Sequence, residues 1–551
     1  MPRPFAAFLL IVPVAAAADP APGPLPAEQA AKTAVLPDGF RLSVYAAEPL
    51  VTQPVSFCLD HRGRVWVAEA LNYGTWQATG KDRIAILDDT DHDGRADKRT
   101  VFFEGFNYVT GIEVGFGGVW VMSPPGLYFV PDRNGDDVPD GPPELVLDGF
   151  GYKESRHNLA NGFTWGPDGW LYGGHGRTSP SDVGAPRTPA AERVHCDGGV
   201  YRVHPVTKKF EVFADGTTNP WGVDFDDFGQ CFVSNCVNPH LFHMIPGGHY
   251  EPWRNRPSSQ YAYERLPTIA DHLHYPGGDI RGDLGKAKTL ELGGGHAHCG
   301  TLVYLGNAFP PQYRNTVLMC NVHGRRVNND ILTRKGSGYT AAHGKDLMVS
   351  ADPWFMGVTL KLDPFGGVLV SDWSDTGECH TYKPDTKTGR IYRITYGEPK
   401  VEPIDLSKLT VQKLVQLQTQ PNEWQVRTAR RLLQERTPNS TARFNLMSRV
   451  ERDADALHRL RAMWAAHAIG GVEQDWLEDR LKDTSEHVRG WAVRFLSERT
   501  PPPLERLEAA ARVAVAAMRG CSRESTARPW LWPMGMDRTA TEISWLAKAL
   551  R

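Results

Sequence analysis

The chain has 551 residues, a length at which we expect roughly three to four domains, or fewer if one of them is a large all-β unit. Hydrophobic residues make up 41% of the chain and charged residues 23%, which excludes a disordered or collagen-like protein. The formal net charge is −3, so the composition gives no support to nucleic-acid binding, which would show a basic excess.

The first 18 residues have the pattern of a secretory signal. Arg3 supplies a positive charge, residues 5–14 form an apolar run, and residues 15–18 are alanines that resemble a cleavage site. The apolar run is shorter than the about 20 residues that a membrane-spanning helix needs, and no other long apolar run follows, so we expect no transmembrane segment. We predict a signal peptide over residues 1–18 and an exported protein, periplasmic or extracellular, with peripheral membrane association left open.

Residues 36–397 repeat one pattern six times. Each copy has an apolar strand, a turn of polar residues and glycine, and a second strand rich in Val and aromatic residues, which is typical of a β-hairpin. The copies are residues 55–67, 111–121, 162–172, 221–233, 300–320 and 358–370. Similar hairpins at intervals of about 50 residues indicate propeller blades. We predict an all-β six-bladed propeller over residues 36–397, preceded by a linker over residues 19–35; a pair of β-sandwiches is the alternative.

The composition changes near residue 400. Residues 401–551 contain five of the 54 glycines and three of the 19 histidines, and they are rich in Arg, Leu and Ala. Helical periodicity is present in residues 424–433, 457–469 and 488–496. A Val-Arg pair recurs in the first and last of these segments. This repetition predicts an all-α HEAT-like solenoid over residues 403–551, with a surface for a protein partner; a plain helical bundle is the alternative.

A loop of carboxylates lies between two predicted strands. Asp89, Asp91, Asp93 and Asp97 surround a turn at Gly94, and alternating carboxylates around a tight turn form the hard oxygen ligands that Ca²⁺ prefers. Since Asp and Gly also favour turns without any metal, an acidic solvated turn is the alternative. We predict a structural calcium site at these four aspartates.

The eight cysteines exclude several metal and haem motifs. No CxxC pair occurs, so zinc-ribbon and thioredoxin-like sites are excluded, and no CxxCH occurs, so no haem is attached covalently. An exported protein can oxidise its cysteines, but we expect most of them to be free buried thiols.

Histidines are concentrated in the predicted loops between strands. These are His157, His175, His240, His243, His249, His272, His274, His296, His298 and His323. Loops at one mouth of a propeller converge on the central channel, where histidine can serve as a base, a metal ligand or a proton shuttle. We predict that this mouth gathers His157, Arg177, His240, His243, His296, His298 and Asp372. For each single histidine, a structural hydrogen-bonding role is the alternative.

Five stretches carry a resemblance to a known family: residues 84–97, 157–172, 219–222, 296–304 with 309–310, and 363–373. They resemble the propeller of the glucose/sorbosone dehydrogenase group, the soluble quinoprotein sugar dehydrogenases. The closest likeness is to exported bacterial proteins called membrane-bound dehydrogenases. In those proteins HEAT repeats follow the propeller, and a cytochrome c module often follows the repeats. No such module is recognisable here, so the resemblance implies a separate cytochrome c as electron acceptor.

The resemblance also implies roles for individual residues. In the quinoprotein dehydrogenases a histidine ahead of a Gly-Pro-Asp hairpin takes the proton from the sugar hydroxyl, and His157 stands ahead of such a hairpin at residues 166–168. The family has an Arg before an Asn-Pro pair beside the quinone, whereas Thr217-Thr218 stand before Asn219-Pro220 here. Arg177 is the candidate to supply the missing charge. The implied cofactors are pyrroloquinoline quinone, as hydride acceptor, and Ca²⁺, as Lewis acid.

Three functions stay open from the sequence. The first is an exported quinone-dependent dehydrogenase of a sugar or polyol, with His157 and Arg177 catalytic and with Asn219, His240, His243, His296, His298 and Asp372 binding the cofactor. The second is a metal-dependent carbohydrate hydrolase or lyase that uses the histidines as ligands. The third is a non-catalytic propeller that binds carbohydrate or protein. A fold alone cannot choose among them.

Overall fold

The computed structural model describes residues 23–499, apart from residues 74, 238, 256, 259–261, 263, 275–290, 376–386, 399 and 437. The predicted signal peptide and the part of the predicted solenoid from residue 500 onward lie outside the described residues. None of the described helices is long and apolar enough to span a membrane.

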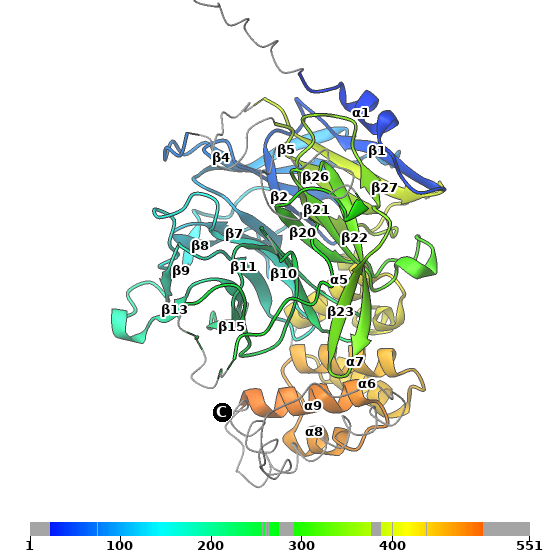
Figure 1. Cartoon of the computed structure of the whole chain (residues 1–551). Coiled ribbons are helices and arrows are strands. Elements are labelled where there is room, and N and C mark those ends of the chain that lie inside the picture. The colour runs from blue at the N-terminus through cyan, green and yellow to red at the C-terminus, as the bar shows by residue number, and fades with distance from the viewer. Residues whose placement is uncertain are drawn as a thin grey trace, which may run out of the picture.

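Six sheets form a six-bladed β-propeller, as the hairpin pattern predicted (Figure 1). Blade 1 contains β2 (Pro54–Leu59), β3 (Val65–Glu69), β4 (Asp82–Asp88) and β5 (Lys98–Phe106). Blade 2 contains β6 (Gly111–Val114), β7 (Gly118–Ser123), β8 (Gly126–Pro131) and β9 (Glu144–Asp148). Blade 3 contains β10 (Ala160–Trp165), β11 (Leu171–His175), β14 (Gly199–Val203) and β15 (Phe210–Gly216), with β19 (His249–Tyr250) parallel to β15.

The second half of the ring is built in the same way. Blade 4 contains β16 (Pro220–Phe225), β17 (Cys231–Asn235) and β18 (Leu241–Met244). Blade 5 contains β20 (His298–Val303), β21 (Val317–Asn321), β22 (Arg326–Lys335) and β23 (Gly338–His343), and β24 (Met348–Val349) pairs with β22. Blade 6 contains β25 (Gly357–Leu362), β26 (Val368–Asp372), β27 (Arg390–Tyr396) and β1 (Phe40–Ala46). A separate pair, β12 (Ser181–Val183) and β13 (Val194–Cys196), lies within the blade 3 segment.

The first strand of the chain closes the ring. β1 pairs antiparallel with β27, so the N-terminal part of the propeller supplies the outer strand of the last blade. Each of the six predicted hairpins is the first strand pair of its blade, for example β2 with β3 and β25 with β26. Ring closure joins residues far apart in sequence and leaves no gap in the ring of blades.

Glycines allow the first strands of neighbouring blades to approach closely. A Cβ on Gly222 in β16 would lie 2.5 Å from the backbone nitrogen of Thr301 in β20, and the φ of Gly222 is +96°. Gly300 in β20 has a φ of +69°, and its Cβ would lie 2.6 Å from the carbonyl oxygen of Val358 in the next blade. Only glycine combines this backbone conformation with such a close contact, which explains why glycine recurs in the repeated pattern.

Residues 411–499 are helical. The helices are α4 (Val411–Gln416), α5 (Glu423–Glu435), α6 (Ser440–Arg452), α7 (Ala456–Ala468), α8 (Gln474–Arg480) and α9 (Glu486–Arg499), and two short 3₁₀ turns lie at Leu406–Lys408 and Leu417–Thr419. The three segments with helical periodicity are α5, α7 and α9, so these predictions are confirmed. α6 packs against α7, and α8 packs against α9. The assignment of these pairs to HEAT repeats stays a prediction.

The segment predicted as a linker contains a helix. α1 (Ala27–Thr33) buries Ala30 and Ala31 in the same hydrophobic core as blades 5 and 6. Alanine has the highest helix propensity, and its small side chain permits close packing, so this short stretch docks on the propeller instead of forming a flexible connection.

The helical region lies against one side of the propeller (Figure 1), and side-chain contacts fix it there. Arg494 on α9 lies 2.8 Å from the carboxylate of Asp168, in the turn between β10 and β11. The indole nitrogen of Trp491 donates to the carbonyl oxygen of Phe228 at 2.8 Å, in the corresponding turn of blade 4. The two parts therefore share one interface on the side of the propeller where these turns lie.

Candidate functional site

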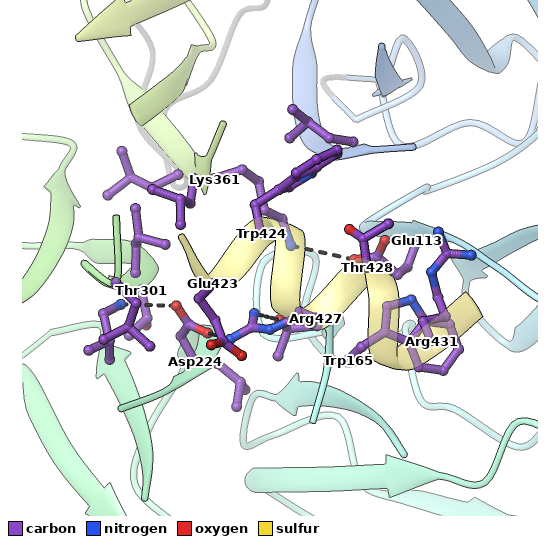
Figure 2. A pocket seen from close by; sticks show the side chains of 18 residues that line it. Glu113, Trp165, Asp224, Thr301, Lys361, Glu423, Trp424, Arg427, Thr428 and Arg431 are labelled. Atoms are coloured by element: carbon purple, nitrogen blue, oxygen red, sulfur yellow. Dashed lines mark hydrogen bonds and ion pairs between the residues drawn. The ribbon is translucent and has the colours of Figure 1, made fainter. Parts of the chain in front are cut away.

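One end of the central channel is covered by helix α5. The C-terminal ends of all six innermost strands, β2, β6, β10, β16, β20 and β25, line a cavity of about 80 Å³ together with side chains of α5. Figure 2 shows α5 lying across this end, with Trp424, Arg427 and Thr428 directed at the strands. Arg427 donates to Thr164 and to Asp224, in both cases at 2.9 Å. We call this the closed end.

The opposite end holds a larger pocket, which we call the open mouth. The loops ahead of the innermost strands line a cavity of about 190 Å³. Its lining is Val55, Ala70, Tyr73, Trp76, Tyr108, Val109, Thr110, Arg156, His157, Asn219, Trp221, Cys236, Ala297, His298, Cys299, Val322, His323, Met356, Val358 and Trp373. Every blade contributes to this lining, because the six innermost strands all begin at this end of the axis.

Aromatic side chains form one wall of the open mouth. The rings of Trp76 and Tyr108 are stacked with centroids 4.2 Å apart. Tyr73 contacts Trp76 and Trp373 edge to face, at 6.0 and 5.7 Å. The guanidinium of Arg156 lies 5.9 Å from the ring centre of Trp76. An apolar aromatic wall with a few polar groups at its edge is the usual composition of a small-molecule site.

A hydrogen-bonded loop holds His157 at the mouth. The side-chain amide of Asn219 donates to the backbone carbonyl of His157 at 3.0 Å. Asn219 is itself held, because its backbone N–H donates to the side-chain oxygen of Asn235 at 2.7 Å. His157 therefore keeps its place although it lies in the loop between β9 and β10. Of the predicted residues, His157, Asn219 and His298 all line the mouth.

Beside the mouth, four potential ligands converge in what we call the His–Asp cluster: His240, His272, His274 and Asp330. Each residue offers one nitrogen or oxygen atom, and these atoms lie within 4.8 Å of one another. His240 Nε2 lies 2.8 Å from Asp330 Oδ2, and His274 Nε2 lies 3.4 Å from Asp330 Oδ1. His298 connects the cluster with the mouth, because its Nε2 lies 2.6 Å from Nδ1 of His274.

Burial sets the protonation of this region. Burial lowers the pKa of His274 to about 3 and moves that of His298 well below its usual range, so both imidazoles are neutral at neutral pH. Burial alone would raise the pKa of Asp330, but the facing histidines hold it well below its usual range, and this carboxylate is ionised. One negative charge therefore lies beside the neutral imidazole of His274, which is available as a ligand or hydrogen-bond partner.

Three of the residues predicted to gather at the mouth are not part of its lining. His243 hydrogen-bonds to Gln230 at 3.0 Å and packs on Tyr339, outside both the cluster and the mouth lining. Arg177 stacks on Trp253, with its guanidinium 4.5 Å from the ring centre. Asp372 is buried and accepts the backbone N–H groups of Met356 and Ser374, both at 2.8 Å. Burial raises the pKa of Asp372 to about 7.

His296 lies next to the mouth but outside its lining and outside the strand that begins with His298. Its ring lies 4.2 Å from that of His323, which lines the mouth. The sequence allowed both histidines of this HxH motif to face one way on a strand. The strand begins only at His298, so His296 lies in the preceding loop and the alternation of a strand does not apply to it.

Sequence reasoning assigned His240 to a site but missed the other three cluster ligands and most of the aromatic wall. His272 and His274 were counted among the loop histidines but not assigned to a site, although their spacing repeats that of His296 and His298. Asp330 has no motif around it; it occupies a buried position in β22, where a strand residue is usually apolar. The sequence carries no local sign that these three residues meet.

The aspartates predicted to bind calcium are brought together in part. Asp89, Asp91 and Asp93 place one carboxylate oxygen each within 4.8 Å of the others. Asp97 instead accepts the hydroxyl of Thr90 at 2.8 Å. Calcium binding here stays a prediction. Five cysteines, Cys58, Cys196, Cys231, Cys299 and Cys320, are free buried thiols, as expected.

The geometry defines a class of protein: a six-bladed propeller that has a pocket lined by aromatic residues and histidines at one end of its axis. A family model described as a domain of unknown function, DUF7133, matches residues 26–398, and the chain belongs to this family. No curated protein matches the chain.

Several solved structures resemble part of the chain at low identity. An oxidoreductase (glucose dehydrogenase) from Thermus thermophilus is 15% identical, with a TM-score of 0.41, and the match covers 64% of this chain and 99% of that one. The PQQ domain of pyranose dehydrogenase from Coprinopsis cinerea is 13% identical, with a TM-score of 0.40 and coverage of 66% and 97%. The calcium-binding protein regucalcin from Agrobacterium tumefaciens is 14% identical, with a TM-score of 0.35 and coverage of 66% and 98%.

Proposed function

We propose that the propeller is an enzyme that binds a sugar or polyol in the open mouth and acts on one of its hydroxyl groups. The observation that carries this proposal is the lining of the mouth, where an aromatic wall faces polar groups that include His157, His298 and His323. The apolar C–H faces of a sugar ring pack on aromatic rings, and its hydroxyl groups bond to polar side chains. A pocket of about 190 Å³ has room for a ligand of this size.

His157 is the base in this proposal. It lines the pocket, it lies in a loop that Asn219 fixes, and imidazole exchanges a proton near neutral pH. Removal of the hydroxyl proton is a step of alcohol dehydrogenation, in which the hydride passes to a separate acceptor, and also of aldol-type cleavage of a sugar. Asn219 is a positioning residue, because it contacts the backbone of His157 and holds the loop in place.

A quinone such as pyrroloquinoline quinone would make this enzyme a sugar dehydrogenase, the finer function implied by the family resemblance. That cofactor carries three carboxylates, which need cationic partners. Among the described residues the lining of the mouth contains one such group, the guanidinium of Arg156, while Arg177 is stacked on Trp253 outside the lining. The described residues therefore do not fit the quinone, and the proposal depends on no step through it.

The test uses the full chain with a panel of aldoses and polyols. Binding is measured by calorimetry, and turnover is followed by product analysis and by dye reduction, with and without added quinone and Ca²⁺. His157→Ala is expected to lower turnover roughly 10²–10⁴-fold while binding persists, since a positioned base contributes about that much. His195→Ala, which removes an exposed histidine on β13, is the matched control and should keep turnover. Equal turnover of His157→Ala and wild type would reject His157 as the base, and absence of binding by the whole panel would reject the function.

A further inference from the structure

The His–Asp cluster joins three separate segments of the chain. His240 comes from the turn between β17 and β18 in blade 4, and Asp330 comes from β22 in blade 5. His272 and His274 come from the long insertion between β19 and β20. We propose that the cluster binds one divalent transition-metal ion of the Zn²⁺ class, which ties this insertion to blades 4 and 5. This inference does not rest on the proposed function.

Buried polar atoms that make no hydrogen bond point to a missing ligand. His274 and Asp330 are both 0% exposed, yet Nε2 of His274 and Oδ1 of Asp330 make no hydrogen bond. The Nε2 atom of His272 also makes none. A buried polar atom that makes no hydrogen bond destabilises the fold, so three of them in one cluster are costly unless something binds them. A metal ion would satisfy all three at once.

The outer nitrogens of two histidines are already held, and this leaves the inner ones for a metal. Nδ1 of His272 lies 2.8 Å from the carboxylate of Asp271, and Nδ1 of His274 lies 2.6 Å from Nε2 of His298. Both rings therefore direct Nε2 at Asp330, from distances of 3.7 and 3.4 Å. A partner on the second nitrogen that fixes ring orientation is the usual accompaniment of metal-bound histidine.

The donor set and its spacing select the kind of metal. Zinc bound tetrahedrally at about 2.0–2.1 Å keeps its ligand atoms roughly 3.3 Å apart. The carboxylate of Asp330 lies at similar distances from the three histidines, with Oδ2 2.8 Å from His240 and Oδ1 3.4 and 3.7 Å from His274 and His272. Three imidazoles with one carboxylate suit Zn²⁺ and its transition-metal neighbours, whereas Ca²⁺ and Mg²⁺ prefer oxygen ligands. One carboxylate also leaves a divalent ion with a net charge of only +1 in a buried place.

A metal ion held by these four ligands would be structural and would fix the insertion to blades 4 and 5. Four protein ligands fill a tetrahedral shell, which is the pattern of structural metal sites. The described part of the insertion already rests on its two neighbours, because Thr268 donates to the carbonyl of Leu241 at 2.6 Å and Asp271 donates its N–H to Ala341 at 3.0 Å. The metal would lock this contact, and through His274 and His298 it would hold one side of the open mouth.

The test compares His240, which immediately precedes β18, with His243, which lies within that strand. The full chain is purified without chelator, and its zinc, iron, manganese, copper and nickel are measured by elemental analysis. We expect one transition-metal ion per chain in wild type and in His243→Gln, whose imidazole is bound to Gln230, and a loss of at least about tenfold in His240→Gln. Removal of the metal with a chelator should lower the Tm of wild type, and Zn²⁺ alone should restore it.

Cobalt provides a direct view of the ligands. Co²⁺ added to chelator-treated wild type should give the intense visible absorption of a tetrahedral nitrogen–oxygen site, and His240→Gln should not. If His240→Gln does not fold, His272→Gln, which removes a ligand at the less buried edge of the cluster, replaces it in both measurements. The proposal is wrong if wild type contains no stoichiometric transition metal and its Tm is unchanged by chelator and by Zn²⁺. It is also wrong if His240→Gln keeps as much metal as His243→Gln. Sugar binding is measured separately, so failure of the metal site and failure of the proposed function are distinguishable.

Discussion

Removal of Arg427 should weaken the attachment of α5 to the closed end of the channel. Its guanidinium donates to Asp224 at 2.9 Å and to Thr164 at 2.9 Å, and the side chain of Asp224 is only 5% exposed. In Arg427→Ala the carboxylate keeps one bond, from the backbone N–H of Val303, and loses its counter-charge. Breaking a buried pair costs about 3–5 kcal/mol. Because the Arg427 side chain is 22% exposed and water can enter, we expect about 2–3 kcal/mol.

The assay is urea unfolding of the full chain, followed by tryptophan fluorescence and by circular dichroism of the helices. Asp224→Asn added to Arg427→Ala should recover part of the loss, since a neutral amide needs no counter-charge. Arg334→Ala is the matched control, because Arg334 pairs with Glu486 across the same interface, but both side chains are about one-third exposed. This variant should cost less than about 1 kcal/mol. Equal costs of the two alanine variants, with no recovery in the double variant, would refute the reasoning.

Three further predictions concern the ring, a buried acid and the acidic loop. Gly222→Ala should lower the Tm strongly, because its Cβ would lie 2.5 Å from Thr301, whereas Gly336→Ala, at a similar positive φ with open space around it, should cost much less in the same thermal scan. Burial raises the pKa of Asp372 to about 7, so the folded protein holds a proton that the unfolded chain has lost; stability should fall as the pH rises from about 4 to about 7, and Asp372→Asn should flatten that fall in unfolding curves taken across this range. Ca²⁺ should raise the Tm, and Asp91→Ala should remove most of the gain in calorimetry; equal melting temperatures with chelator and with Ca²⁺ would leave a solvated turn.

The blades could be predicted because each hairpin is a local pattern. A stretch such as residues 55–67 carries its own strand, turn and strand, and the turn residues decide the pairing. Closure of the ring could not be predicted in this way. β1 pairs with β27, which is far from it in sequence, and no pattern within residues 40–46 identifies β27 as the partner strand.

In the candidate site, too, the residues within local sequence patterns could be predicted and the residues that depend on distant segments could not. His157 was found because it precedes a recognisable hairpin, and Asn219 because it lies in an Asn-Pro pair. Asp330 was not found, because its meaning depends on histidines that come from two other segments. Arg177 was chosen for its charge alone, and in the structure that charge is directed at Trp253. Charge and residue type indicate what a side chain can do, but only the fold decides what it faces.

The affinity of the open mouth for a sugar or polyol tests the central claim most directly. Trp76 stacks on Tyr108 and forms the aromatic wall, so Trp76→Ala should weaken binding of the preferred ligand roughly thirtyfold, which corresponds to about 2 kcal/mol. Trp476→Ala, on α8 in the helical region, is the matched control and should leave the Kd unchanged. The account predicts saturable binding by wild type with this separation between the two variants. Absence of binding in wild type, or an equal Kd for Trp76→Ala and wild type, would contradict it.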